Sequence, residues 1–396
     1  MNFIFISPNF PNTYYRFCVA LRKNGVTVLG IGDAPYDSLS QDVKNSLNEY
    51  YYVSNLKNYN EKKEAVSFFQ NKYGKIDFIE SNNEFWLEDD AKLRTDFDIV
   101  TGPQIEQICS FRKKSEMKKY YKLAGVKTAR GEIVTTFENA KSFIEKVGYP
   151  VVTKPDDGVG ASKTYAIHND DELVAFFANK DNRVYFMEEF VEGELISYDG
   201  VCDSKSEVVY PTHHVFPIQV MDIVNNVKES VYYTVPVIPE DLDKLGRAVI
   251  KAFNAKSRFF HLEFFRLTKS KKGLGKKGDI IGLEVNMRVP GGYTPDLINF
   301  AYSIDIYQIW ADVMAFDENR QPQLYEKQYA CYVGRRNYVA YANYLEAINQ
   351  KYKDHIVWSQ GMPEILSDAM GNYFFMAKFS NKSEMDEFIE FLTRRI

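Results

Sequence analysis

Residues 283–292, which read Leu-Glu-Val-Asn-Met-Arg-Val-Pro-Gly-Gly, constrain the fold of this chain more than any other segment. Polar and apolar residues alternate along them. A β-strand here would carry Glu284, Asn286 and Arg288 on one face and the apolar residues at 283, 285, 287 and 289 on the other. A carboxylate, an amide oxygen and a guanidinium together suit a divalent cation held beside phosphates. A half-exposed antiparallel strand with no such role would show the same alternation, so other segments must decide between these interpretations.

A second acid lies in another strand-like segment, residues 259–265, at Glu263. His261 precedes it by two positions and would therefore share its face of the strand. These two strands predict a site with two carboxylates. Single histidines are more often structural than catalytic, so His261 is expected to lie beside the site rather than to react.

Length and composition limit the class of protein. A chain of 396 residues is expected to form two or three domains, and its 45% hydrophobic and 26% charged residues are ordinary for a soluble globular protein. No apolar run approaches the roughly 20 residues of a membrane span, and no signal peptide is evident. The four cysteines are far apart, and the net charge is −5. We therefore expect a cytoplasmic protein that binds neither membranes nor nucleic acid.

The first 105 residues alternate strand and helix patterns, which predicts a parallel sheet with helices on both faces. Gly30-Ile31-Gly32 follows a predicted strand but lacks the rest of the dinucleotide fingerprint, so no nicotinamide site is predicted. Residues 111–124 then read as one basic helix that ends at Gly125.

Lys154 ends a predicted strand at residues 151–154, and another strand is expected at 164–168. The connecting segment carries Gly158, Gly160 and Ser162, whose backbone N–H groups can approach phosphates without obstruction by side chains. This strand–loop–strand pattern differs from the P-loop, in which the glycines lead into a helix.

Four elements therefore stand in order along the chain: a helix with Lys114, the hairpin after Lys154, a Glu-rich segment at 188–194, and two acid-bearing strands. This order resembles the ATP-grasp superfamily, in particular its carboxylate–amine (amino-acid) ligases and the related biotin carboxylase and carbamoyl phosphate synthetase domains. The resemblance covers residues 1 to about 300. It implies an α/β and α+β fold, with a Rossmann-like pre-ATP-grasp domain at 1–110, a connecting helix at 111–129, a mobile lid at 130–186 and a C-terminal subdomain at 187–396.

The resemblance also implies a nucleotide site. The residues expected to bind ATP are Lys114, Lys154, Gly158, Gly160, Ser162, Glu188, Val191 and Glu194. Lys113, one position earlier, is an alternative candidate for the role of Lys114. Backbone groups at 188 and 191 would pair with the adenine edge, and Glu194 would accept from the ribose hydroxyls. Glu189 and Glu192 are expected to face solvent.

The same resemblance assigns the remaining site residues. Glu263, Glu284 and Asn286 would hold Mg²⁺ or Mn²⁺, and catalysis would depend on Arg288, Lys154 and Asn286. The substrate contacts would be Arg288, Gly291, Gly292, His261 and His214.

The implied reaction is activation of a small carboxylic acid by ATP as an acyl phosphate, followed by attack of an amine with release of ADP and phosphate. Two alternatives stay open: a bicarbonate-phosphorylating subunit of the carboxylase or carbamoyl-phosphate type, and a non-catalytic ATP-binding module. The presence of both acids, Asn286, Arg288 and Lys154 speaks against the module. Relatives are often homodimers, but the sequence identifies neither the oligomeric state nor the acid and the amine.

Overall fold

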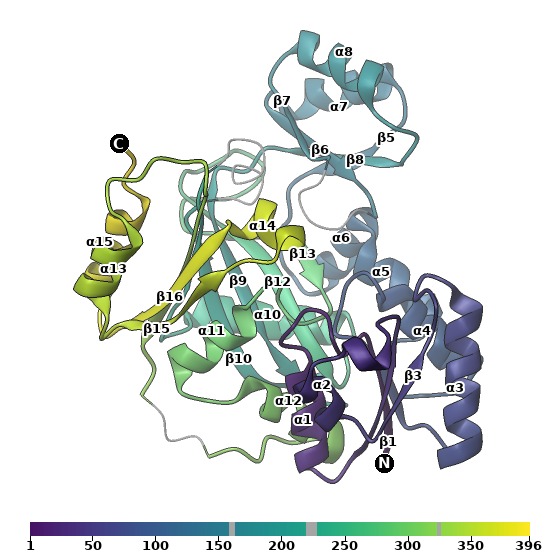
Figure 1. The fold of residues 1–396 in the computed structure, drawn as a ribbon. Coiled ribbons are helices and arrows are strands. Elements are labelled where there is room, and N and C mark those ends of the chain that lie inside the picture. Colours follow the sequence, from purple (N-terminus) through teal and green to yellow (C-terminus); the bar gives the residue numbers. More distant parts are fainter. Residues whose placement is uncertain (158–162, 219–227, 323–325) are drawn as a thin grey trace.

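Three β-sheets organise the chain (Figure 1), and the computed structural model describes residues 1–157, 163–218, 228–322 and 326–396. The predicted phosphate-binding residues Gly158, Gly160 and Ser162 lie outside the described residues. None of the helices in the described ranges is long and apolar enough to cross a membrane.

The N-terminal sheet is parallel, has the order β3-β2-β1-β4, and carries helices on both faces (Figure 1). The alternation of strand and helix patterns predicted this arrangement. Its central strands β1 and β2 are buried on both sides, as parallel strands between helices must be. The elements are β1 (Asn2–Ile6), α1 (Tyr15–Lys23), β2 (Thr27–Gly32), α2 (Gln41–Ser46), β3 (Glu49–Tyr52), α3 (Tyr59–Tyr73), β4 (Phe78–Glu80) and α4 (Leu87–Asp96).

The connection to the next sheet corrects the prediction of one helix at 111–124. Two helices are present, α5 (Ile108–Arg112) and α6 (Lys114–Leu123), because Lys113 between them has an extended backbone. Asp156 provides hydrogen-bond acceptors for the first N–H groups of α6. Its backbone oxygen accepts from Lys114 N at 2.9 Å, and its Oδ1 accepts from Ser115 N at 2.8 Å. A helix begins where its first N–H groups find such acceptors.

The second sheet is antiparallel, has the order β5-β8-β6-β7, and lies apart from the other two at the top of Figure 1. Its two helices pack their apolar residues onto one face of the sheet. The elements are β5 (Gly131–Val134), α7 (Phe137–Val147), β6 (Val151–Pro155), β7 (Tyr165–Ile167), α8 (Asp170–Asn179) and β8 (Tyr185–Glu189). The hairpin predicted around residues 151–168 is therefore β6 and β7.

The third sheet is antiparallel and has the order β13-β12-β9-β10-β11-β14-β16-β15. Its strands are β9 (Gly193–Cys202), β10 (Val208–Phe216), β11 (Ser230–Thr234), β12 (Arg258–Leu267), β13 (Ile280–Asn286), β14 (Tyr329–Arg335), β15 (Ile356–Gly361) and β16 (Tyr373–Phe379). The accompanying helices are α10 (Glu240–Ala252), α11 (Thr294–Tyr302), α12 (Ile306–Phe316), α13 (Leu345–Tyr352), α14 (Glu364–Met370) and α15 (Lys382–Thr393).

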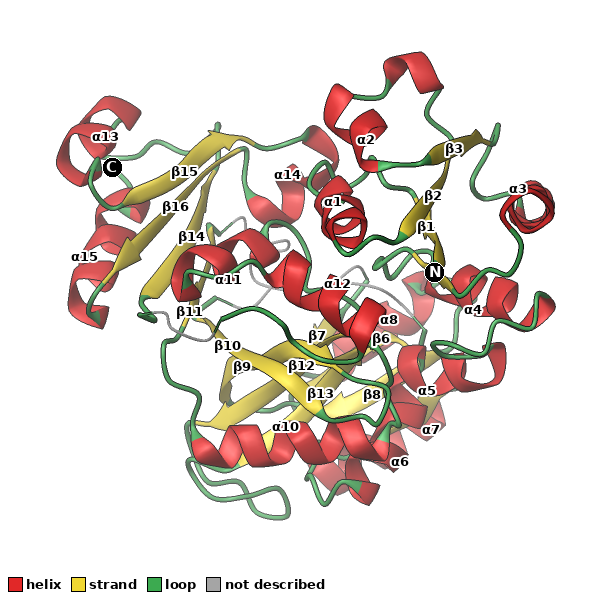
Figure 2. Ribbon diagram, turned by 90° about the horizontal axis from the view of Figure 1, so that it is seen from below, coloured by secondary structure: helices red, strands yellow, loops and turns green. Residues whose placement is uncertain are grey.

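Helices cover the two faces of this sheet differently, as Figure 2 shows. On one face α10 packs against an apolar surface that includes Tyr198 and Leu262. On the other face α12 covers Val201 and Phe259. Along β9 and β12 this second face turns polar beyond α12, at positions that alternate with the apolar residues of the first face. The predicted metal ligands lie on that polar part.

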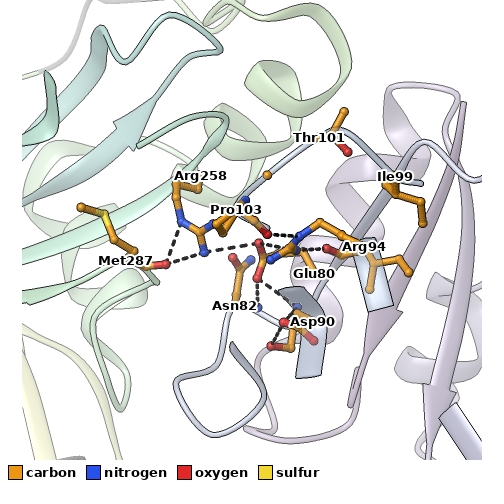
Figure 3. A network of polar contacts seen from close by, with 12 residues as sticks. Glu80, Asn82, Asp90, Arg94, Ile99, Thr101, Pro103, Arg258 and Met287 are labelled. Carbon is orange, nitrogen blue, oxygen red and sulfur yellow. Dashed lines mark hydrogen bonds and ion pairs between the residues drawn. The ribbon is translucent and has the colours of Figure 1, made fainter. Parts of the chain in front are cut away.

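A buried polar network joins the N-terminal sheet to the third sheet (Figure 3). The Glu80 carboxylate lies 3.7 Å from Arg94 and 3.4 Å from Arg258, and Arg258 Nε donates to Met287 O at 2.8 Å. Because Met287 stands between Asn286 and Arg288, this network fixes the backbone that carries both. Removal of one member of such a buried charged network would leave the other charges without a partner, so the network requires all its members.

Asp90 borders this network and is expected to make stability depend on pH. Burial raises the pKa of Asp90 to about 7, and the Glu80 charge acts in the same direction. An unfolded aspartate has a pKa of about 3.9. The folded chain therefore binds more protons between about pH 4 and pH 7, and its stability falls as pH rises through this window, by at most about 1.4 kcal/mol per pH unit.

Asp90→Asn should reduce that loss, which melting temperatures at pH 5 and pH 8 would reveal. The matched control is Asp98→Asn, which changes an exposed aspartate near the same helix. A variant Asp90→Asn with the wild-type fall in melting temperature would show that Asp90 is not responsible.

Candidate active site

The two predicted acids face each other across neighbouring strands. In the antiparallel pairing of β12 and β13, Glu263 is directly opposite Glu284, and His261 is opposite Asn286. Directly paired residues lie on the same face of a sheet with Cβ atoms about 5 Å apart. The register therefore brings both carboxylates and the amide of Asn286 together.

The prediction for the strand at 283–289 was wrong in two respects, namely where the strand ends and which way Leu283 faces. β13 ends at Asn286, and Leu283 lines the cleft instead of lying on the opposite face. A register shift between Glu263 and Phe264 interrupts the alternation beside Leu283.

Arg288 consequently stands beyond the strand. Its Nε donates to Glu84 Oε2 at 3.2 Å and its Nη1 to Val289 O at 2.8 Å. Glu84 belongs to the N-terminal unit, so this unit reaches the polar end of the cleft.

Lys114, the first residue of α6, points into the site and Lys113 does not. Lys114 is 4% exposed, and its Nζ lies 3.1 Å from Glu284 Oε1, whereas Lys113 is exposed. Helix α6 approaches β13 closely because Gly282 has no side chain: a Cβ there would lie 2.6 Å from the ring of Tyr121. Tyr121 also donates its hydroxyl to Glu284 O at 3.0 Å.

Glu188 lies between two lysines. Its Oε2 is 2.7 Å from Lys154 Nζ, and its Oε1 is 2.6 Å from Lys118 Nζ. Burial acts to raise the pKa of Glu188, but the charges of Lys154 and Lys118 outweigh it and lower the pKa to about 2. Sequence reasoning missed Lys118, although it follows Lys114 by four positions on one helix and therefore shares its face.

The segment after Glu188 corrects one prediction. Glu189 does not face solvent: it is buried and paired with Arg130 at 2.7 Å and Lys271 at 3.1 Å. Two residues that follow differ in their exposure: Val191 lines the cleft, whereas Glu192 is exposed, as predicted.

Glu194 is exposed and precedes the cleft-lining Leu195 on β9. Neighbouring strand residues point to opposite faces, so the alternation directs Glu194 away from the cleft. Its role at the ribose stays a prediction that this geometry does not favour.

One cleft contains most of the predicted site. It is lined by Lys114, Ala129, Val152, Lys154, Thr164, Glu188, Glu189, Phe190, Val191, Leu195, Glu263, Phe265, Ile281, Gly282, Leu283, Glu284, Asn286 and Arg288. The strand register orders these residues: Phe265 pairs with Leu195 and Ile281, while Glu263 pairs with Glu284. An apolar row, formed by Leu195, Phe265 and Ile281, thus lies beside a charged row, formed by Glu263 and Glu284. This arrangement suits a ligand with a flat apolar ring and an anionic tail.

The histidines occupy positions next to the cleft. His261 lies between Asp199 and Glu263, and His214 Nδ1 is 2.6 Å from Asp199 Oδ2. Burial acts to lower the pKa of His261, but the nearby Asp199 carboxylate raises it to about 9. Sequence reasoning missed Asp199. The available signal was that Asp199 and Ser197 are two positions apart in a predicted strand and therefore share one face of it.

Gly291 and Gly292 follow Arg288 outside the strand. Gly292 has φ +62°, a conformation that favours glycine, and a Cβ there would lie 2.6 Å from Met370. Their contact with a substrate stays a prediction.

The residues present fit a hard divalent cation. Two facing carboxylates and an amide oxygen are the ligand types that Mg²⁺ prefers, with phosphate and water completing its shell. Within the described ranges, no group of three or more His, Cys, Asp or Glu side chains is placed to hold a metal ion.

Residues 113–213 match the family described as the carbamoyl-phosphate synthase L chain, ATP binding domain. An L-amino acid ligase from Bacillus licheniformis superposes on 98% of this chain and 96% of its own, with a TM-score of 0.68 and 14% identity. The chain has the ATP-grasp fold. The biotin carboxylase domain of Hydrogenobacter thermophilus 2-oxoglutarate carboxylase, solved with MgADP, ADP and bicarbonate, shares this ATP-grasp fold with a TM-score of 0.68 and 18% identity, over 96% of this chain and 86% of its own.

The predicted resemblance and fold class are thus confirmed. Among curated relatives, the L-arginine-specific L-amino acid ligase of Bacillus subtilis is 25% identical over 263 residues, which are 64% of this chain and 60% of the relative. The chain therefore spans about three fifths of that relative's length. The match to the carbamoyl-phosphate synthase ATP binding domain includes Lys114, Lys154 and Glu188 but ends before β12, so the placement of Glu263 and Glu284 in the site is supported by the geometry of the sheet.

Proposed function

We propose that the chain is an ATP- and Mg²⁺-dependent ligase that activates a small carboxylic acid as an acyl phosphate and couples it to an amine. The observation that carries this proposal is the pairing of Glu263 with Glu284 in a cleft that also contains Lys114, Lys154 and Arg288. The similarity to L-amino acid ligases favours an amino acid as one substrate.

The nucleotide would lie along the cleft, with its base on the apolar row and its phosphates among the lysines. Backbone groups between Glu188 and Val191 would meet the edge of the base. Lys114 and Lys154, which are paired with carboxylates in this structure, would exchange those partners for phosphate oxygens. Lys118 would then keep Glu188 neutralised.

Glu263, Glu284 and Asn286 would hold Mg²⁺, which neutralises charge on the phosphates during transfer. Arg288 follows these ligands directly, and its planar fork suits either the substrate carboxylate or the transferring phosphoryl group. The substrate carboxylate attacks the γ-phosphorus and ADP leaves. The amine then attacks the acyl carbon and releases phosphate.

Residues 130–186 would act as a lid over the nucleotide. They belong almost entirely to the second sheet, which lies apart from the other two, and Lys154 is on its strand β6 (Figure 1). Closure would exclude water from an acyl phosphate, which water hydrolyses. The N-terminal domain at 1–110, the connection at 111–129, the C-terminal subdomain at 187–396 and a homodimer complete this proposal.

Phosphate release from Mg-ATP tests the proposal. The full chain is incubated with pools of amino acids, pools of small carboxylic acids, and bicarbonate in a separate sample. Release that requires an acid and an amine together would support a ligase. Release with bicarbonate alone would indicate a carboxylase-type reaction, and bound ATP without release in any sample would indicate a non-catalytic module.

A further inference from the structure

A chain of buried polar groups leads away from the proposed metal site. Asp199 on β9 is 0% exposed, and it lies among donors on two neighbouring strands. His261 Nδ1 donates to Asp199 Oδ1, and His214 Nδ1 donates to Asp199 Oδ2 at 2.6 Å. The Ser197 hydroxyl also donates to Oδ2. Both carboxylate oxygens of Asp199 are therefore held in place.

His261 connects this carboxylate to a proposed metal ligand. Its Nε2 lies 3.1 Å from Glu263 Oε1, while its Nδ1 contacts Asp199. Two contacts on opposite sides of one ring fix its plane, so Asp199 orients the His261 ring toward Glu263.

The two acids of the site are held in different ways. Glu284 is paired with Lys114, which lines the cleft and would turn to phosphate when a nucleotide binds. Glu263 is held by His261, which lies behind it in the sheet, at the position that pairs with Asp199. The contact of Glu263 can therefore persist while the cleft fills.

We propose that Asp199 and His261 are positioning residues, which hold one oxygen of Glu263 so that its other oxygen is presented to the divalent cation. The terminal torsion of a glutamate is otherwise broad, so an unrestrained carboxylate must be ordered when the cation binds. Hydrogen bonds that orient ligands contribute about 10- to 100-fold to metal affinity. This inference rests on the proposed function, since it assumes a cation at Glu263.

Binding of Mn²⁺ tests the inference, measured by electron paramagnetic resonance of the free ion with the ADP-saturated full chain. Asp199→Asn and His261→Gln should each weaken Mn²⁺ binding about 10- to 100-fold. Binding of ADP in the presence of EDTA should equal that of the wild type, which also shows that the variants are folded.

His213→Gln is the matched control. His213 is also buried, but it lies on the opposite face of β10 and its Nδ1 contacts Ser197 O at 2.8 Å instead of Asp199. It should retain wild-type Mn²⁺ affinity.

The outcomes separate the two proposals. Variants that bind Mn²⁺ as well as the wild type, or a control that loses as much affinity, would overturn the positioning role alone. A wild-type chain that binds ADP but no Mn²⁺ would overturn the metal site of the proposed function, and this inference with it.

Discussion

Glu284→Gln should lower ATP-dependent phosphate release at least about 100-fold, because a metal-stabilised phosphoryl transfer draws several kcal/mol from its cation, and each 1.4 kcal/mol is a factor of ten. The variant removes one of two directly paired carboxylates and leaves Lys114 without the charge that faces it. The glutamine side chain has nearly the same shape as the glutamate that it replaces. Phosphate release at saturating substrates is the measurement, and the melting temperature shows whether the fold is retained.

The control for this variant is Glu192→Gln. Glu192 is an exposed glutamate paired with Lys269 at 2.8 Å, and it does not line the cleft. It should retain wild-type phosphate release. If Glu284→Gln were as active as this control, the assignment of Glu284 to the metal would be wrong.

Lys154→Met is expected to raise the KM for ATP about 10- to 100-fold, because a hydrogen bond to a charged group contributes about 1.5–3 kcal/mol. Lys154 is buried on β6, and its charge is maintained: burial acts to lower its pKa, but Glu188 and Glu284 raise it above the ordinary value. A methionine keeps the length of the side chain and removes the charge. Initial rates over a range of ATP concentrations, together with direct binding of ADP, measure the effect.

Lys163→Met is the comparison within the same hairpin. Lys163 is exposed and paired with Asp181 at 2.9 Å. Its replacement should change the KM for ATP less than threefold. Equal changes in both variants would mean that the hairpin contributes only a diffuse charge, and that Lys154 has no specific contact with phosphate.

The alternation of polar and apolar residues was sufficient to predict which side chains share a face. This held for Glu263 with His261 and for Glu284 with Asn286, because side-chain direction in a strand follows from the backbone of that strand alone. The prediction was wrong where β13 ends and where Leu283 lies. A register shift and the end of a strand depend on the neighbouring strand, which a local pattern does not contain.

The parallel N-terminal sheet and the β6–β7 hairpin were predictable for the same local reason, since their periodicity and their glycines lie within short segments. The break before α6 was not predictable, because the residue that caps this helix is Asp156, which follows strand β6 and is distant from α6 in the sequence. The same break places Lys114 in the cleft and Lys113 outside it.

The sequence by itself therefore determined the order of the elements and the kinds of groups that the site contains. Only the tertiary structure decided how the charges are paired: Glu188 with Lys154 and Lys118, Glu284 with Lys114, and His261 with both Glu263 and Asp199. The physical reason is that a buried charge is stable only beside a partner, and these partners are brought together by strand register and by the packing of α6 against β13, not by nearness in the sequence.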